Sequence, residues 1–249
     1  MLGRVYTAVP AAGSAIRMGL GYSKAYVDVG GKPLLARTIE SLLASPFIDR
    51  LTVAVRPDEL DLASREILGT LGLTDTTVKI IAGDDQRQKT VDRLLTAAPS
   101  ERDLVLIHDG ARPLVSTKLI HDVLETAAEW GAAIAAIPVT DTIKESLDGG
   151  ETVSGTVDRA RFYRAQTPQA FHRDIIVAAH RRARKEGWKV TDDASLLEQM
   201  GHEVRIVKGE ERNIKIKTLE DLELVRWIFQ SRNFLEPFDA ETERRGDEE

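Results

Sequence analysis

The sequence contains no cysteine, which excludes disulfide bonds and thiolate metal sites. It has no apolar run near the roughly 20 residues that a membrane-spanning helix needs, and no charged-then-apolar leader precedes its first apolar segment. Its 34 basic residues are outnumbered by 40 acidic ones, and the net charge of −6 argues against general nucleic-acid binding. These absences predict a cytoplasmic protein that binds neither membrane nor nucleic acid.

What the sequence does contain is an alternation of strand-like and helix-like segments. Short apolar runs typical of strands cover residues 5–9, 51–55, 78–81, 104–107, 133–139 and 204–207. Helical patterns begin at Pro33 and Pro57 and cover 91–97, 117–130, 173–186 and 218–229. This order predicts an α/β fold whose mostly parallel sheet is covered on both faces. We expect one domain over residues 1–235 and a charged, disordered tail over 236–249.

A different pattern interrupts this alternation between residues 140 and 158. Two short strand-like segments, 142–144 and 152–158, flank Asp148-Gly149-Gly150, a strong turn sequence. The pattern predicts a β-hairpin inserted into the α/β order. Because a two-stranded hairpin is marginal alone, it must lean on a second subunit or on its own domain, and the sequence leaves both open.

The loop after the first strand has the composition of a phosphate site. Ala11, Ala12 and Gly13 carry almost no side chain, so a ligand can approach the backbone N–H groups closely. Arg17 and Lys24 add positive charge nearby. The loop lacks both the Gly-Lys-Ser/Thr ending of a Walker sequence and the repeated glycines of a dinucleotide fingerprint. It predicts a triphosphate cradle, with an ordinary β-loop-α turn as the alternative.

The carboxyl ends of parallel strands meet at one edge of a sheet, so the loops after residues 9, 81 and 107 should share one crevice. Asp109, followed by small residues and Arg112, can hold Mg²⁺ against phosphate oxygens; a turn aspartate is the alternative. We expect His108 to be a packing residue at the strand end. The segment 83–90 is expected to contact base or ribose, with Thr90 as a hydroxyl donor, or to form a plain polar turn.

Three polar segments in the second half of the chain also stand out, at residues 156–159, 166–171 and 191–195. Each has a structural alternative: a turn after the hairpin, a loop between elements, and a helix N-cap, respectively. Residues 213–216 are strand-like, and alternation places Lys215 opposite the buried face, where solvent exposure is the simplest expectation.

Together these segments resemble the 2-C-methyl-D-erythritol 4-phosphate cytidylyltransferases of the non-mevalonate isoprenoid pathway, from about residue 5 to residue 224. The blocks that carry the resemblance, in one order, are Pro10-Ala11-Ala12-Gly13, Arg17-Met18, Lys24, His108-Asp109, Ala111-Arg112-Pro113, Asp141-Thr142, Thr156-Val157-Asp158-Arg159, Thr167-Pro168-Gln169, Thr191-Asp192 and Asn213-Ile214-Lys215.

The resemblance implies a Rossmann-like nucleotidyltransferase fold and a homodimer joined through the hairpin arm. It implies that CTP binds at Ala11, Ala12, Gly13, Asp85 and Thr90, and that Asp109 lies near Mg²⁺. It also implies substrate contacts from Arg112, Thr142, Arg159, Thr167 and Thr191, partly across the dimer interface, and catalytic charge from Arg17, Lys24 and Lys215.

The implied reaction transfers CMP from CTP to a polyol phosphate and releases pyrophosphate. The attacking group is a phosphate monoester, whose second pKa is about 6, so it is largely ionised at neutral pH and needs no general base. The remaining task is to bring two anions together and to stabilise charge at the α-phosphorus, which lysine, arginine and Mg²⁺ can supply. We expect in-line attack without a covalent enzyme intermediate.

The sequence departs from the family pattern in the loops that should hold the nucleotide. Ala15 and Asp84 replace glycines, and Ser23 and Ala25 flank Lys24 in place of the usual proline and glutamine. If position 15 requires a positive φ, alanine there costs about 1–2 kcal/mol, and the Asp84 carboxylate is expected to crowd the base or to select among bases. Two rival functions stay open: a ribitol 5-phosphate cytidylyltransferase and a catalytically silent nucleotide-binding dimer.

Overall fold

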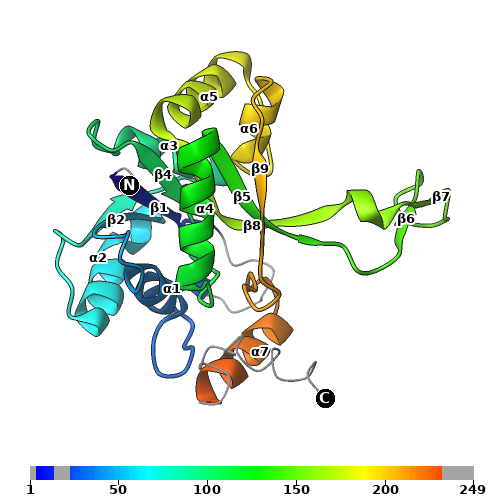
Figure 1. Ribbon diagram of the computed structural model, residues 1–249. Coiled ribbons are helices and arrows are strands. Elements are labelled where there is room, and N and C mark those ends of the chain that lie inside the picture. The colour runs from blue at the N-terminus through cyan, green and yellow to red at the C-terminus, as the bar shows by residue number, and fades with distance from the viewer. Residues whose placement is uncertain (1–3, 14–22, 232–249) are drawn as a thin grey trace, which may run out of the picture.

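The computed structural model describes residues 4–13 and 23–231, and its centre is a seven-stranded sheet of order β3-β2-β1-β4-β8-β5-β9 (Figure 1). The strands are β1 (Val5–Pro10), β2 (Leu51–Val55), β3 (Val78–Ala82), β4 (Leu104–Ile107), β5 (Ala132–Pro138), β8 (Tyr163–His172) and β9 (Arg205–Lys208). Only β8 runs antiparallel to its neighbours. The predicted mostly parallel sheet is therefore confirmed. Arg17, Ala15 and the tail 236–249 lie outside the described residues.

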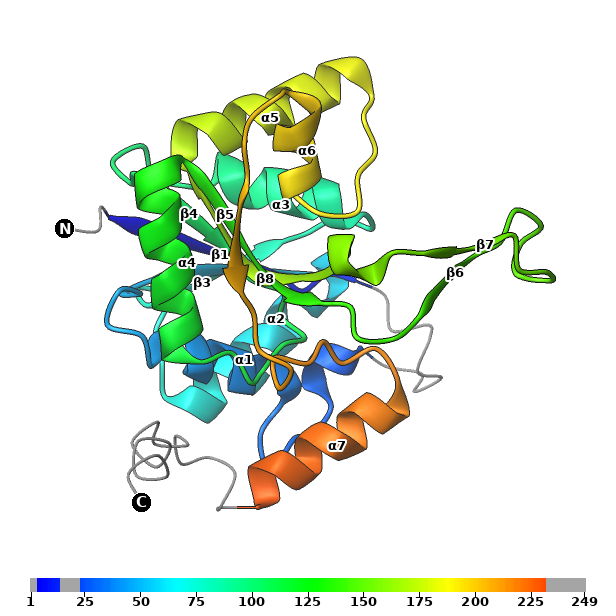
Figure 2. The same cartoon turned by 45° about the vertical axis from the view of Figure 1, so that its right-hand side comes forward.

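Helices cover both faces of this sheet, as predicted. The main helices are α1 (Leu34–Leu43), α2 (Leu60–Ala63), α3 (Arg87–Thr96), α4 (Thr117–Trp130), α5 (Arg173–Glu186), α6 (Ala194–Gln199) and α7 (Leu219–Gln230). Short helical turns lie at Lys24–Tyr26, Pro57–Glu59, Ser64–Gly69 and Arg159–Arg161. Apolar side chains of α1, α2 and α4 form one core with the sheet, and those of α3, α5 and α6 form the other (Figure 2). Within the described part of the chain, no helix is long and apolar enough to cross a membrane.

Helix α7 closes a third, smaller core next to the segments that contain Lys24 and Lys215. Its Leu222 and Val225 pack with Val27 and Ile216, which flank Lys24 and Lys215 in the sequence. The predicted helix start is confirmed, because Thr218 and Asp221 form a reciprocal capping box at its first turn. This packing connects the last helix to the segments that carry both lysines.

The prediction that residues 166–171 form a loop between elements is wrong. They lie in β8, inserted between β4 and β5, with Leu106 opposite Ala170. The polar composition conceals the strand, because its buried polar side chains bond to neighbouring segments instead of facing water. Gln166 donates to the Glu210 carbonyl at 2.8 Å, and Gln169 donates to the Asp192 carboxylate at 2.8 Å.

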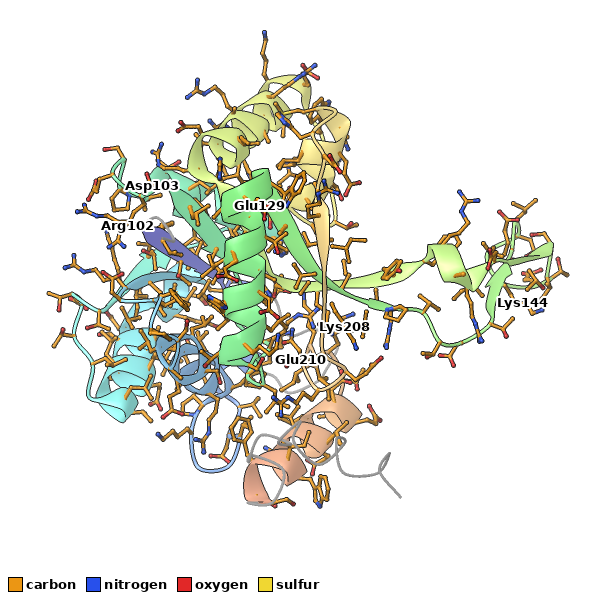
Figure 3. The ribbon with its side chains drawn as sticks, in the orientation of Figure 1. Arg102, Asp103, Glu129, Lys144, Lys208 and Glu210 are labelled. Carbon is orange, nitrogen blue, oxygen red and sulfur yellow. The ribbon has the colours of Figure 1, made fainter. Side chains whose placement is uncertain are left out.

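The predicted hairpin is present as β6 (Ile143–Glu145) and β7 (Gly155–Val157), which pair only with each other. The first strand is shifted by one residue from the predicted 142–144, and the second is shorter than the predicted 152–158. The Asp148 carboxylate accepts hydrogen bonds from the N–H groups of Glu151 and Thr152, which gathers the turn into a wider loop. The arm projects from the body with Lys144 far out along it (Figure 3). The hairpin thus does not lean on its own domain.

Candidate active site

The loops after β1, β3 and β4 meet at one edge of the sheet, as predicted. The loops after β1 and β4, together with α3 residues that follow the β3 loop, line a pocket of about 220 Å³. We call it the loop pocket. It is lined by Pro10, Ala11, Ala12, Gly13, Lys24, Ala25, Leu34, Arg87, Thr90, Asp109, Gly110, Ala111 and Lys215. The crevice therefore contains the small residues and Lys24 of the first loop, Thr90, and the carboxylate that follows β4.

Small residues let these three loops approach one another closely. The backbone N–H of Ala11 bonds to the Ala54 carbonyl at 2.8 Å, and that of Gly83 bonds to the Val55 carbonyl at 2.7 Å. A Cβ atom at Gly83 would lie 2.5 Å from the Ala12 Cβ, a distance that real side chains do not tolerate. The small-residue pattern thus reflects packing between loops as well as space for a ligand.

Thr90 holds the loop after β3 rather than presenting a free hydroxyl. Its Oγ1 donates to the Asp84 carbonyl and accepts from the Asp84 N–H, both at 3.0 Å. The Asp84 carboxylate pairs with Arg93 at 2.6 Å and does not line the loop pocket. The expectation that this carboxylate crowds the base or selects among bases stays a prediction. Asp85 also lies outside the pocket lining, with its side chain 80% exposed.

Asp109 is the centre of the site and is surrounded by cations. Its carboxylate is buried; Oδ1 accepts from Arg87 Nε at 3.1 Å, Oδ2 accepts from Lys215 Nζ at 2.6 Å, and Arg112 Nε lies 3.8 Å from Oδ2. Burial acts to raise the pKa of Asp109, but Arg87 and Lys215 outweigh it and hold that pKa far below its usual range. The carboxylate therefore remains ionised throughout the physiological pH range.

The predictions for Lys215 itself are wrong in two respects. Residues 213–216 form no strand, and the Lys215 side chain is only 30% exposed, because it turns inward to Asp109. The extended segment passes beside the first loop, where Lys24 Nζ donates to the Ile216 carbonyl at 3.0 Å. The two lysines, distant in sequence, are thereby brought to the same pocket.

His108 is buried, as predicted, but it is more than a packing residue. Its Nε2 lies 3.0 Å from the Arg112 carbonyl, an acceptor, so Nε2 carries the proton and Nδ1 is an acceptor. Thr167 Oγ1 lies 3.3 Å from Nδ1 and accepts from the Asp109 N–H at 3.0 Å. The Thr167 hydroxyl proton is therefore donated to His108, and this chain of bonds fixes the backbone at Asp109.

A second pocket, of about 680 Å³, adjoins the loop pocket; we call it the wide pocket. Its lining includes Arg112, Thr167 and Thr191, which were predicted to bind substrate, and it shares Arg87, Asp109 and Lys215 with the loop pocket. Arg112 is buried and donates to the Asn213 carbonyl at 2.6 Å. Burial lowers its pKa.

Two predicted substrate residues do not join this site within one chain. Thr142 and Arg159 are exposed on the arm and line neither pocket, and Arg159 bonds to the Thr140 carbonyl. Arg87, in contrast, lines both pockets but was not among the predicted site residues. The sequence signal that could have identified Arg87 is its position in the polar segment 83–90. The sequence separation of Arg87 and Asp109 gives no indication that the two side chains pair.

The buried His108 predicts a pH dependence of stability. Burial lowers its pKa from 6.5 to about 4, so between these values the unfolded chain binds a proton that the folded chain does not. The free energy of unfolding should fall as the pH drops through this window, by up to about 1.4 kcal/mol per pH unit. Urea unfolding measures this free energy at pH 7 and at pH 5. The difference between the two values should be smaller for His108→Gln than for the original chain. His202→Gln, which changes an exposed histidine, is the control and should keep the difference of the original chain. The same difference in His108→Gln would show that His108 does not cause the pH dependence.

Comparison with known proteins agrees with this geometry. The family model described as 2-C-methyl-D-erythritol 4-phosphate cytidylyltransferase matches residues 5–231. Proteins of that name from Desulforamulus reducens and Syntrophotalea carbinolica are 38% and 42% identical over 93% and 89% of this chain, and over 98% and 94% of their own length.

Solved structures show the same likeness. The 4-diphosphocytidyl-2C-methyl-D-erythritol synthase of Anaerococcus prevotii superposes with a TM-score of 0.79 at 30% identity, and the cytidylyltransferase of Thermus thermophilus with 0.72 at 33%. Each alignment covers 92% of this chain and 100% of the solved one. The chain therefore belongs to the 2-C-methyl-D-erythritol 4-phosphate cytidylyltransferase family.

Proposed function

We propose that this chain transfers CMP from CTP to 2-C-methyl-D-erythritol 4-phosphate, giving 4-diphosphocytidyl-2-C-methyl-D-erythritol and pyrophosphate. The observation that carries the proposal is that two adjoining pockets share Arg87, Asp109 and Lys215. A transferase must hold a donor and an acceptor side by side, and both substrates here are anions. Shared cations between two pockets meet that requirement, in a chain whose relatives have this activity in their names.

The loop pocket is the proposed CTP site. Ala11, Ala12 and Gly13 leave the backbone of the first loop open to base and ribose, and Lys24 lines the same pocket and is the proposed phosphate contact. Arg17, proposed for the same role from the sequence, lies outside the described residues. Thr90 contributes by fixing the loop after β3. Asp85 would reach the ribose only if its exposed side chain turns toward the bound nucleotide.

The wide pocket is the proposed site of the acceptor phosphate. Arg112 and Lys215 supply positive charge to its lining, and Thr191 supplies a hydroxyl from the turn before α6. The Thr167 proton is already donated to His108, so Thr167 can only accept from a substrate hydroxyl. Its main contribution is to hold the N–H of Asp109 in place.

Asp109 is the proposed protein ligand of Mg²⁺. Among the described residues, no three carboxylate or imidazole groups gather to hold a metal by themselves. Magnesium usually combines one or two carboxylates with substrate phosphates and water, and each oxygen of Asp109 keeps a second lone pair beside its bond to Arg87 or Lys215. The residues present therefore fit the ion, which when bound would neutralise phosphate charge.

The chain's own side chains would act by position and charge. The acceptor phosphate oxygen forms a bond to the α-phosphorus of CTP, and the bond from that phosphorus to the bridging oxygen breaks as pyrophosphate leaves. Lys24 and Lys215, held at the same pocket, would stabilise the charge that builds on the phosphoryl oxygens. No residue needs to remove a proton, because the attacking oxygen is already ionised.

A homodimer joined by the arm is part of the proposal. Thr142 and Arg159 are exposed on an arm that extends from its own body (Figure 1). Leu147 and Val153 near the arm's end are 85% and 65% exposed, which is apolar area that a second copy could cover. The arm could then bring both polar residues to the wide pocket of its partner.

The function is tested by pyrophosphate release from CTP and Mg²⁺ with each of two acceptors. We expect release with 2-C-methyl-D-erythritol 4-phosphate and none with ribitol 5-phosphate. Release with ribitol 5-phosphate alone would replace the proposed acceptor. Calorimetric binding of CTP without release in the presence of either acceptor would instead favour a silent nucleotide-binding protein.

Replacing either lysine should slow the reaction strongly. Lys24→Ala and Lys215→Ala are each expected to lower turnover by at least about a hundredfold, the usual loss when one group that stabilises the transition state is removed. Lys118→Ala, on the exposed face of α4, is the matched control and should keep full turnover. Normal turnover in either site variant would remove that lysine from the mechanism.

Deleting residues 145–155 should impair dimerisation, because the deletion removes most of the arm while leaving the sheet and its helices intact. Sedimentation velocity would measure the change, and an unchanged melting temperature of the body would show that the fold survives. A deletion variant that sediments entirely as a dimer would show that the arm is not needed for association.

A further inference from the structure

Arg87 is the first residue of α3 and bridges two buried carboxylates. Its Nε donates to Asp109 Oδ1 at 3.1 Å, and its Nη1 donates to Asp193 Oδ2 at 2.7 Å. The side chain is 26% exposed and lines both the loop pocket and the wide pocket. Arg87 thus lies at the junction where the proposed donor and acceptor would meet.

The second carboxylate serves as an anchor for Arg87. Asp193 lies at the N-cap of α6, is 1% exposed and lines neither pocket. His180 of α5 contacts its other oxygen, with Nε2 3.2 Å from Oδ1. A buried carboxylate needs such partners to remain ionised, and Arg87 outweighs burial to hold the pKa of Asp193 below its usual range. Among the described residues, the Asp193 carboxylate is hydrogen-bonded to this arginine and this histidine alone.

The bridge requires an arginine. A guanidinium presents several N–H donors in a rigid plane, so it can hold two carboxylates in fixed directions, whereas lysine offers a point charge on a flexible stem. Asp109 is held on the other side by Lys215 at 2.6 Å, with Arg112 Nε at 3.8 Å. Without Arg87, Oδ1 would lose its hydrogen-bond donor, and the carboxylate would be free to rotate about its contacts with these two cations.

We propose that Arg87, anchored by Asp193 and His180, is a positioning residue of the reaction that fixes the Asp109 carboxylate at the junction of the two pockets. This rests on the proposed function, since Asp109 and Lys215 are taken as its metal ligand and charge stabiliser. Arg87 fixes the Asp109 oxygen Oδ1, so that the other oxygen, Oδ2, meets Lys215 in one orientation.

Arg87→Lys is the main variant, because it keeps the positive charge and removes the planar set of N–H donors that bridges the two carboxylates. We expect kcat to fall by about tenfold to a hundredfold, the range associated with misplacing a group by about 1 Å, with a change of less than threefold in the KM for CTP. Asp193→Asn keeps Arg87 but weakens the ion pair that anchors it, so it should also lower kcat, by a smaller factor than Arg87→Lys does. Normal kcat in both variants would overturn the proposal.

The matched control is Arg102→Gln. Arg102 is similarly tied, to Asp49 at 3.1 Å and to the Val5 carbonyl at 2.9 Å, but it lies on the side of the molecule away from the arm (Figure 3). Its loss should lower the melting temperature without changing kcat. If the control lowers kcat as much as Arg87→Lys does, the effect is one of stability alone and the positioning role is wrong.

A double-mutant cycle separates positioning from direct contact with substrate. If Arg87 acts through Asp109, Arg87→Lys should cost less than about twofold in kcat on an Asp109→Asn background, because the group that it positions has lost its charge. Losses that multiply would mean that Arg87 contacts the substrates independently, which overturns the proposal.

Failure of the proposed function can be told apart from failure of this inference. If the original chain releases no pyrophosphate with either acceptor, the reaction is wrong, and calorimetry of CTP binding at a series of MgCl₂ concentrations then tests Arg87. We expect Arg87→Lys to require a higher MgCl₂ concentration for half-maximal affinity. An unchanged magnesium dependence would show that Arg87 does not position Asp109.

Discussion

The site depends on the ion pairs around one buried carboxylate. Asp109 remains ionised because Arg87 and Lys215 bond to its two oxygens, and these cations are in turn tolerated at the pocket floor because the carboxylate lies between them. Without Asp109, Arg112 and Arg87 would repel each other in a largely dehydrated space. The mutual attraction fixes the positions of the charges before any substrate arrives, which is the condition under which electrostatic stabilisation is most effective.

The fold supplies these charges from segments that are distant in sequence. Arg87 begins α3, Asp109 and Arg112 follow β4, and Lys215 lies in the extended segment after β9. Parallel strands bring the loops after β1, β3 and β4 to one edge. The antiparallel β8 beside β4 adds the Thr167 hydroxyl, which accepts from the Asp109 N–H at 3.0 Å. Each contribution therefore depends on strand order rather than on sequence proximity.

Periodicity predicted the strands, the helices and the common edge, since these follow from local patterns of apolar residues. It failed for β8, because buried Gln166 and Gln169 satisfy their polar groups through distant partners that no local pattern reveals. The failed prediction that Lys215 faces solvent has the same cause, because its side chain turns inward to Asp109, which is 106 residues away in the sequence. Most of the described residues that the family resemblance names line one of the two pockets, but Thr142 and Arg159 lie on the arm and line neither.

The buried histidine next to Asp109 lines neither pocket and is not placed for acid–base catalysis. His108 donates Nε2–H to the Arg112 carbonyl and accepts from Thr167 at Nδ1, so both ring nitrogens are occupied. Burial lowers its pKa to about 4, and the neutral ring adds no further positive charge beside Arg112 and Lys215. A protonated ring would repel both and would lose its bond from Thr167. The imidazole therefore serves to hold the backbone at Asp109 and Arg112.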